Sequence, residues 1–435
     1  MDIKTKNCEE NNESLTYDIK PEKLENLIKI IDKTNDFNLK CFENILCSPG
    51  SSSGDNYMSV IKRVHIFGKD FNNQEQCFTV IVKRQIPSKS RRELYRCDEA
   101  FNNEINAYKY VIPMLENYCN RQFLPKCFFA GNDENGEIIV LEDLKQLGFK
   151  MKNRLIALDF DHCVLVMKEL ARMHAASISA KELNQKDFHQ NRQQIKEIVY
   201  CKEAEEFYRN VLDSSITNAL LSLHLSNTNN FLTEPIKSIE LLRTTLFERI
   251  QNLIITSKCD AYNVICHGDL WVNNIMFKWN YDEKSPIDAK FFDLQTMRYT
   301  SLVFDILHFI YTSTKRDLRE VNLKNILQSY SSALILNLEN NFLPNNYEKL
   351  KNIKDIYSLE NIMKQFYTNI LYGLVAAIWI LPAVTFDPTN IPNLNDICDD
   401  KNVKELNLLP NLTQEYHDRI KDITLEFYEN GFLQI

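Results

Sequence analysis

The sequence of 435 residues lacks the patterns of several well-defined protein classes. Its 51 lysines and arginines against 59 aspartates and glutamates give a net charge of −8, so it lacks the basic footprint of a nucleic-acid-binding protein. Its 12 cysteines form no CxxC pair and no Cys/His spacing of the zinc type, which favours reduced thiols and a cytoplasmic location. The first residues are polar, and we expect no signal peptide there.

Long apolar runs are scarce as well. One run, Ile370–Phe386, approaches the length of a membrane-spanning helix, but it contains Tyr372, Gly373 and Pro382. A buried helix near the C-terminal end of the core accounts for it better, so we expect no membrane partner. Nothing in the sequence indicates an oligomeric state.

The chain has the composition of an ordinary soluble globular protein, with 44% hydrophobic and 25% charged residues. Its length exceeds the ~250–300 residues at which a single hydrophobic core stops growing, so two lobes are expected. We predict a polar helical extension at 1–35, a sheet lobe with one helix at 36–144, and a helical lobe at 145–435.

The order of hydrophobic patterns supports this division. Strand-like runs such as MSVIKRVHIF and CFTVIVKRQI come first, and a helical segment at Ser90–Cys119 and a further strand follow them. Helical periodicity dominates beyond residue 150, with one interruption at Val264–Gln295 that reads as three strands. Strands first and helices afterwards, without an internal repeat, predict an α+β fold of two lobes with an N-terminal antiparallel sheet.

The stretch His267–Asn274, HGDLWVNN, carries the clearest chemistry. Phosphoryl transfer needs an aspartate for the acceptor hydroxyl, an asparagine that turns back to hold Mg²⁺, and a second metal-binding aspartate. Asp269, Asn274 and Asp293 meet these demands in the right order. Asp293 ends an apolar strand, where a carboxylate is costly to bury unless it is paired or bound to metal.

Each of these residues has a plainer alternative. Asp269 alone could cap a turn, and Asn273 competes with Asn274, although only Asn274 has the D-x-x-x-x-N offset. His267 is expected to brace the loop by hydrogen bonds and not to act as a base.

The sheet lobe offers a lysine and a carboxylate. Lys83 lies in the strand FTVIVK, and Glu104 lies at the edge of the apolar stripe of the next helix, where it needs a cationic partner. We therefore predict an ion pair between them and a role for Lys83 in gripping phosphates. The turn that contains Ser53, Gly54 and Asn56 could place backbone N–H groups over phosphates, although it reads equally as a plain hairpin.

With these pieces in order, the sequence resembles the ecdysteroid kinase-like family of insects, part of the larger group with choline-kinase and aminoglycoside-kinase folds. The resemblance runs from about residue 36 to about residue 400, and HGDLWVNN followed by D-x-Q after a hairpin is specific to this group. The matching stretches are GDNYMSVIKRV at Gly54–Val64, IVKRQIP at Ile81–Pro87, FNNEINAYKYVIPML at Phe101–Leu115, VLEDLKQLGF at Val140–Phe149, LARMHAAS at Leu170–Ser177, CHGDLWVNNIMF at Cys266–Phe277 and FFDLQ at Phe291–Gln295.

The resemblance implies a protein-kinase-like fold that binds ATP and Mg²⁺. By position, Asp269 would be the catalytic base, Asn274 and Asp293 would hold metal, and Lys83 would contact phosphate with Glu104 behind it. The backbone from Glu142 to Leu144 would hold adenine. Asp305 and His174 would be structural, Asp305 as a support of the catalytic loop and His174 as a packed helix residue.

The resemblance also implies the substrate, a small-molecule alcohol with an ecdysteroid favoured. Foreign alcohols or phenols phosphorylated in detoxification are the alternative. A pseudokinase scaffold is disfavoured because the key residues are intact, and a protein kinase is disfavoured because HRD, DFG and APE signatures are missing.

Overall fold

The computed structural model describes residues 39–50, 58–133, 136–255, 260–282, 284–342, 347–386 and 412–433. The chain divides into two compact units, one of residues 1–47 and 64–78, the other of residues 48–63 and 79–435. The predicted extension at 1–35 lies outside the described residues. The predicted lobe limits at residues 36, 144 and 145 stay a prediction.

The smaller unit contains most of strand β1 (Leu39–Pro49) and the parts of β2 (Ser59–Asp70) and β3 (Glu75–Gln85) that flank their turn. The turn between β2 and β3 is organised by one aspartate. The Asp70 Oδ1 atom accepts the backbone N–H groups of Asn72 at 2.8 Å and of Gln74 at 2.9 Å. The polar turn that the sequence predicts between these two strands is therefore present.

The larger unit holds the remainder of the sheet, whose strand order is β1-β2-β3-β5-β4. Strand β5 (Gly136–Glu142) pairs antiparallel with both β3 and β4 (Cys127–Asp133). Val80 and Val82 point to one face of β3 and are buried, so Ile81 and Lys83 point to the other face by the alternation of a strand.

The helical segment predicted at Ser90–Cys119 is interrupted. Arg96 adopts a left-handed conformation with φ 52°, which separates two helices, and a π-helical turn follows the second of them. Neither a single left-handed arginine nor the one extra residue of a π-helical turn changes the apolar periodicity of the sequence. The sequence therefore predicts one continuous helical segment where the structure has several. The pieces are α2 (Lys89–Tyr95), α3 (Cys97–Asn106), η1 (Ala107–Val111) and α4 (Ile112–Glu116).

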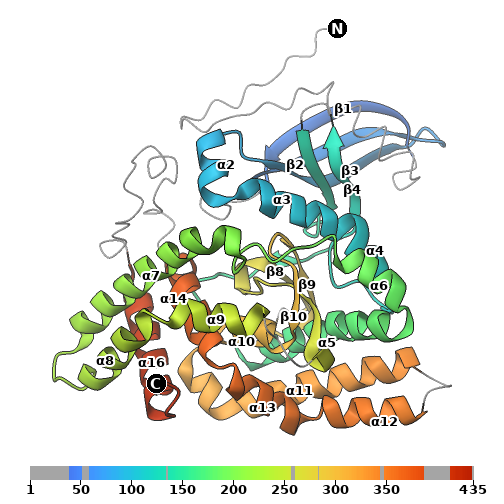
Figure 1. Cartoon of the computed structure of the whole chain (residues 1–435). Coiled ribbons are helices and arrows are strands. Elements are labelled where there is room, and N and C mark those ends of the chain that lie inside the picture. The colour runs from blue at the N-terminus through green and yellow to red at the C-terminus, as the bar shows by residue number, and fades with distance from the viewer. Residues whose placement is uncertain are drawn as a thin grey trace. The chain divides into compact units, whose positions relative to one another are not determined.

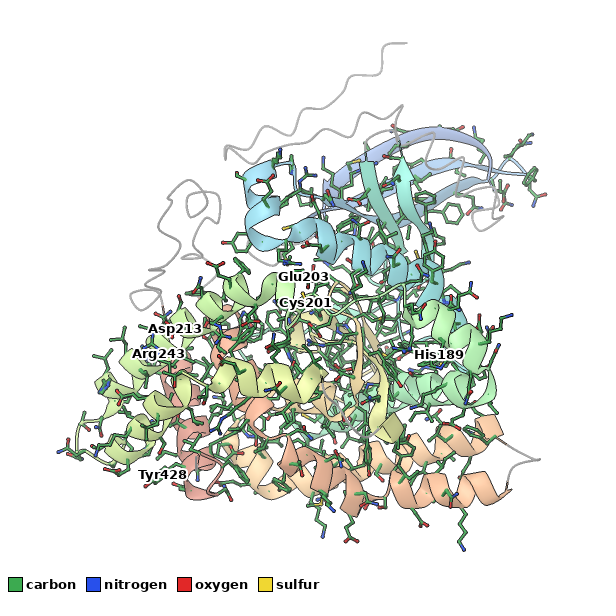
Figure 2. The ribbon with its side chains drawn as sticks, viewed as in Figure 1. His189, Cys201, Glu203, Asp213, Arg243 and Tyr428 are labelled. Carbon is green, nitrogen blue, oxygen red and sulfur yellow. The ribbon has the colours of Figure 1, made fainter. Side chains whose placement is uncertain are left out.

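The rest of the larger unit is mostly helical (Figure 1). The long helices α5 (Phe160–Leu183) and α11 (Arg316–Phe342) pack side by side. Helices α7 (Glu205–Ser226) and α8 (Thr233–Arg243) form a hairpin, in which Asp213 and Arg243 meet at 2.5 Å (Figure 2). The other helices are α6 (Gln185–Arg192), α9 (Leu246–Ile255), α10 (Val303–Ser313), α12 (Tyr347–Ile356), α13 (Leu359–Thr368), α14 (Leu371–Thr385) and α16 (Gln414–Glu429).

The apolar run near the C-terminal end forms α14, which is buried against α10, as the sequence predicts. A side chain at Gly373 would place its Cβ 2.3 Å from the Tyr311 ring of α10, so this close approach requires glycine. Among the described residues no single helix is long and apolar enough to cross a membrane, and α13 and α14 meet that test only as a pair bent by 65°.

In the described part of the helical region, five short strands lie between the helices. β7 (Asn263–Cys266) pairs with β10 (Arg298–Ser301), while β8 (Ile275–Trp279) pairs with both β6 (Lys150–Met151) and β9 (Pro286–Phe291). All these pairs are antiparallel, and they leave two loops between them, residues 267–274 and 292–297. The predicted fold class is confirmed: α+β, with an antiparallel sheet followed by a mostly helical region.

Candidate active site

The loop that follows β7 is pressed against the loop that follows β9. Gly268 has φ 88°, and a Cβ there would lie 2.1 Å from the carbonyl oxygen of Thr296. A side chain at this position would therefore both strain the backbone and force the two loops apart. The sequence HGD thus requires glycine for a tertiary reason, because residues far apart in the chain approach each other there.

Asp305, in the first turn of α10, binds the backbone of the same loop. Its carboxylate accepts the backbone N–H of His267 at 2.7 Å and of Gly268 at 2.9 Å, and His174 Nε2 lies 3.1 Å away. Burial would raise the pKa of this carboxyl, but His174, His267 and the Gly268 N–H outweigh burial and lower it from 3.8 to about 2. Asp305 is therefore an anion that organises the loop, in agreement with its expected structural role.

Replacing Asp305 by asparagine should destabilise the protein by at least the ~1–3 kcal/mol typical of leaving a buried polar group without its hydrogen-bond partner. In the new amide an NH₂ donor replaces one of the two accepting oxygens, so one of the backbone N–H groups of His267 and Gly268 loses its acceptor. Because the folded-state pKa is depressed, the stability contributed by Asp305 is complete above pH ~4 and is lost as the pH falls towards 2.

Denaturant unfolding of both proteins at neutral pH and at several pH values down to 2 checks this prediction. The gap between the two unfolding curves should close at low pH. Equal stability at neutral pH would contradict the assigned role of Asp305.

His267 is a brace and not a base in this geometry. Its Nε2 atom lies 3.0 Å from the carbonyl oxygen of Phe292, and its Nδ1 atom lies 3.3 Å from the backbone N–H of Asp269. Burial lowers the pKa of His267, so the ring is neutral, donates to Phe292 and accepts from Asp269. These two bonds join both loops and agree with the bracing role expected from the sequence.

Asp269 is the next residue of the loop after Gly268. Asn274 donates its Nδ2 atom to the Asp269 backbone oxygen at 2.8 Å and to Oδ2 at 3.0 Å, while His308 Nε2 lies 3.2 Å from Oδ1. Burial would raise the pKa of the Asp269 carboxyl, but the imidazoles of His308 and His267 and the Trp271 side chain outweigh burial, so the pKa is lowered. The side chain is 20% exposed, so an ionised carboxylate is available to a ligand.

The predicted ion pair of Lys83 and Glu104 is present and includes a third residue. Lys83 Nζ lies 2.6 Å from Glu104 Oε2 and 2.6 Å from Asp293 Oδ1. Burial would lower the pKa of Lys83, but the carboxylates of Asp293 and Glu104 outweigh burial and raise it above its ordinary value. The lysine is therefore a buried cation whose position is fixed from both sides.

Asp293 and Asn274 lie at the same end of the β8–β9 pair. The backbone N–H of Phe292 donates to the carbonyl oxygen of Asn274 at 3.1 Å, which links the two segments. Asp293 has φ 68°, a strained conformation for a residue other than glycine and one that recurs at functional sites. The Asn274 Oδ1 atom accepts no hydrogen bond from the described part of the chain, so it is free to ligate a metal.

One cavity of about 840 Å³ lies beside these groups, and Asp269 is not among the described residues that line it. Lys83, Glu104, Asn274 and Asp293 line it together with Asn273, which therefore remains a possible partner of the same ligand. Apolar side chains form other parts of the wall, namely Ile61, Ile81, Leu141, Phe149, Met276 and Phe292.

The segment that the sequence assigns to adenine forms part of the cavity wall. Glu142 and Leu144 both line it, and the Leu144 backbone N–H donates to no acceptor among the described residues. A free backbone donor beside apolar walls suits a flat heteroaromatic ring. Carboxylate and carboxamide oxygens near a lysine suit Mg²⁺ and phosphates. The residues present therefore fit Mg²⁺ and a nucleoside triphosphate, while the predicted Ser53, Gly54 and Asn56 lie outside the described residues.

Two features of the site are absent from the sequence-based prediction. Arg63 of β2 contacts Asp143, the middle residue of the segment Glu142–Leu144, at 2.7 Å, and both residues line the cavity. His308 approaches Asp269 from α10. Neither pair has a local signal in the sequence. Arg63 and Asp143 are 80 residues apart, and His308 lies in an apolar helix, far along the chain from Asp269.

The sheet that carries a buried lysine paired with a helix glutamate, and the loop and strand ends that carry Asp269, Asn274 and Asp293, define a protein-kinase-like fold. The chain belongs to the ecdysteroid kinase-like family, whose model matches residues 53–341. The suspected family is thus confirmed.

Among solved structures, the GDP complex of wild-type aminoglycoside 2'-phosphotransferase-IIIa matches at 12% identity and a TM-score of 0.35, over 82% of this chain and 97% of that one. A GDP complex of a point mutant of that enzyme also matches at 12% identity and a TM-score of 0.35, over 81% of this chain and 95% of that one. The complex of APH(2")-IIIa with GDP and kanamycin matches at 12% identity and a TM-score of 0.35, over 81% of this chain and 96% of that one. Among curated proteins, no relative matches.

Proposed function

We propose that this protein is an ATP-dependent kinase that phosphorylates a hydroxyl group of a small molecule. The observation that carries the proposal is the meeting of two clusters at one site. Lys83, Glu104 and Asp293 form the first cluster, and Asp269 with Asn274 forms the second. Membership of the ecdysteroid kinase-like family supports the same reaction class.

The first cluster would hold the nucleotide. When bound, ATP would supply the phosphoryl group, and Mg²⁺ would supply a positive charge that neutralises the negative charge of the phosphates. Lys83 would contact phosphate oxygens from a position fixed by Glu104, and Asp293 and Asn274 would ligate the metal. Because the protein carries a net charge of −8, Lys83 and the metal must create the local positive field that attracts an anionic nucleotide.

Asp269 would act on the acceptor alcohol. Its carboxylate is ionised and partly exposed, so it can accept the proton of a hydroxyl group and aim the hydroxyl oxygen at phosphorus. Asn274 Nδ2 donates a hydrogen bond to Asp269 Oδ2 at 3.0 Å, and this bond limits rotation of the carboxylate. Such positioning is the main contribution that a protein makes to phosphoryl transfer.

Adenine would lie between the apolar walls, with the backbone of Glu142 to Leu144 as its hydrogen-bonding edge. The free Leu144 N–H is the observation that supports this placement. Ser53, Gly54 and Asn56 would cover the phosphates with backbone N–H groups, as their small-residue turn suggests.

The acceptor that we favour is an ecdysteroid or a similar apolar alcohol, and foreign phenols are the alternative. The family name supports the steroid. The acceptor would be bound by the helical lobe (145–435), in the segments at about 178–245 and after residue 310, while the sheet lobe (36–144) would bind nucleotide. We place the reaction in the cytoplasm, on the grounds of the scattered cysteines, which form no CxxC pair in the sequence.

A panel of acceptors tests the proposal. Purified protein is incubated with Mg²⁺, ATP labelled at the γ-phosphate, and separately an ecdysteroid, simple phenols, an aminoglycoside and a generic protein substrate. We expect label in an ester of a steroid alcohol or a phenol, and none on protein. Label on the protein substrate, or no turnover with any acceptor despite nucleotide binding, would overturn the proposal.

A further inference from the structure

His308 reaches the oxygen of Asp269 that Asn274 leaves open. Its Nε2 atom lies 3.2 Å from Asp269 Oδ1, and its side chain is 7% exposed. The contact is not aligned as a hydrogen bond, and this buried atom has no other partner among the described residues. A small rotation of the imidazole ring or the carboxylate would align it. The two carboxylate oxygens are thus approached by different donors, Asn274 on Oδ2 and His308 on Oδ1.

Helix α10 presents His308 on the face that already organises the loop. His308 lies three residues after Asp305, so the two side chains point to the same side of the helix. Asp305 accepts two backbone N–H groups of the loop, and His308 contacts the side chain that follows them. One rigid element therefore fixes both the backbone and the carboxylate of Asp269.

The other ring nitrogen of His308 is also occupied. Nδ1 lies 3.4 Å from the Tyr372 hydroxyl, and Arg298 donates Nη2 to that hydroxyl at 3.2 Å. Burial raises the pKa of Tyr372, so the phenol keeps its proton. Because Arg298 can only donate, the Tyr372 oxygen accepts from it and the phenolic O–H is available to His308 Nδ1, an arrangement in which the Nε2–H faces Asp269.

The packing of α14 on α10 makes this chain of contacts rigid. Tyr372 stacks edge-on against Phe304 with ring centroids 4.9 Å apart, and its neighbour Gly373 permits the close approach to Tyr311. Arg298 is held in turn by Glu197 at 3.0 Å and by the carbonyl oxygen of Gly268 at 2.8 Å.

We propose that His308 is a positioning residue for Asp269. It holds the carboxylate in the orientation that accepts the acceptor hydroxyl, and Tyr372 and Arg298 fix its ring and its tautomer. The inference rests on the proposed kinase function and adds to it a residue outside the loop motif.

Kinetics of two variants test this role. His308→Leu removes the donor and should lower kcat by about 10²-fold, the size of effect that a small misplacement of a reacting group produces. Its nucleotide dissociation constant should stay within about twofold, because no contact to the nucleotide cluster is lost. His308→Gln places an amide donor at a similar reach and should recover most of kcat. His189→Leu, on the exposed surface of α6 (Figure 2), is the matched control.

A double variant tests whether His308 acts through Asp269. Once Asp269 is replaced by asparagine, adding His308→Leu should cause no further loss of kcat, since residues that act as a unit are not additive. Multiplicative losses in the double variant, or no rescue by His308→Gln, would overturn the proposal.

A measurement without nucleotide separates this inference from the proposed function. The ¹⁵N resonances of His308, identified by their loss in His308→Gln, should report a proton on Nε2 and should shift in Asp269→Asn but not in His189→Leu. Unshifted resonances would overturn the contact. A wild type without phosphoryl transfer would overturn the proposed function, whereas an active wild type with an equally active His308→Leu would overturn only the role of His308.

Discussion

Replacing Asp269 by asparagine should reduce turnover by at least the ~10²–10⁴-fold typical of acid–base groups, with little change in the affinity for Mg²⁺–ATP. The variant keeps the size and polarity of the side chain but removes the negative charge that accepts the hydroxyl proton. Lys83 and Asp293, which would bind the nucleotide, do not contact Asp269 through any hydrogen bond among the described residues. Steady-state kcat and a direct nucleotide dissociation constant, measured on the same preparation, check both halves of the prediction.

The matched control is Asp317→Asn, an exposed aspartate in the first turn of α11. This variant should behave as the wild type in both measurements. Wild-type turnover in Asp269→Asn would mean that another group accepts the proton and that the loop motif has been assigned wrongly.

Replacing Asp293 by asparagine should fail in a different way. Asp293 is proposed to be a metal ligand, so its loss should weaken productive Mg²⁺–ATP binding by at least the ~10–100-fold that even a contact supporting a metal ligand contributes. Lys83 would keep Glu104 at 2.6 Å, so the buried cation stays paired and the fold should survive. Nucleotide affinity measured over a range of Mg²⁺ concentrations gives the answer.

Excess Mg²⁺ distinguishes the two aspartates. It should restore part of the activity of Asp293→Asn, because a weakened site fills at higher metal concentration, and it should restore none in Asp269→Asn. If the two variants responded alike to Mg²⁺, the separate roles proposed for these aspartates would be wrong.

The sequence predicts the fold class and the ion pair well because both depend on short patterns. Alternating apolar residues place Ile81 and Lys83 on one face of β3, and helical spacing places Glu104 on the edge of the buried stripe of α3. A buried carboxylate next to a buried lysine has few alternatives to pairing. The distance of 2.6 Å between Lys83 and Glu104 confirms that expectation.

Other parts of the site depend on tertiary contacts that no local pattern encodes. His308 lies in FDILHFIYTS, where a histidine reads as one more packed residue, and its partners Asp269 and Tyr372 come from other segments. The break between helices α2 and α3 depends on one arginine with a left-handed backbone conformation, Arg96. Residue 268 must be glycine because Thr296 of a different loop leaves no space for a side chain. Such constraints become visible only when the distant segments are brought together.

The most direct test of the central claim is a single-turnover experiment with γ-labelled ATP, Mg²⁺ and the best acceptor of the panel. Wild-type protein in excess over ATP should transfer the label to an organic phosphate ester, with one ADP formed for each ester. Asp269→Asn, loaded to the same nucleotide occupancy, should leave the ATP intact on that time scale. Equal ester formation by both proteins, or ADP formation without any ester in the wild type, would contradict a kinase that uses Asp269 to act on an alcohol.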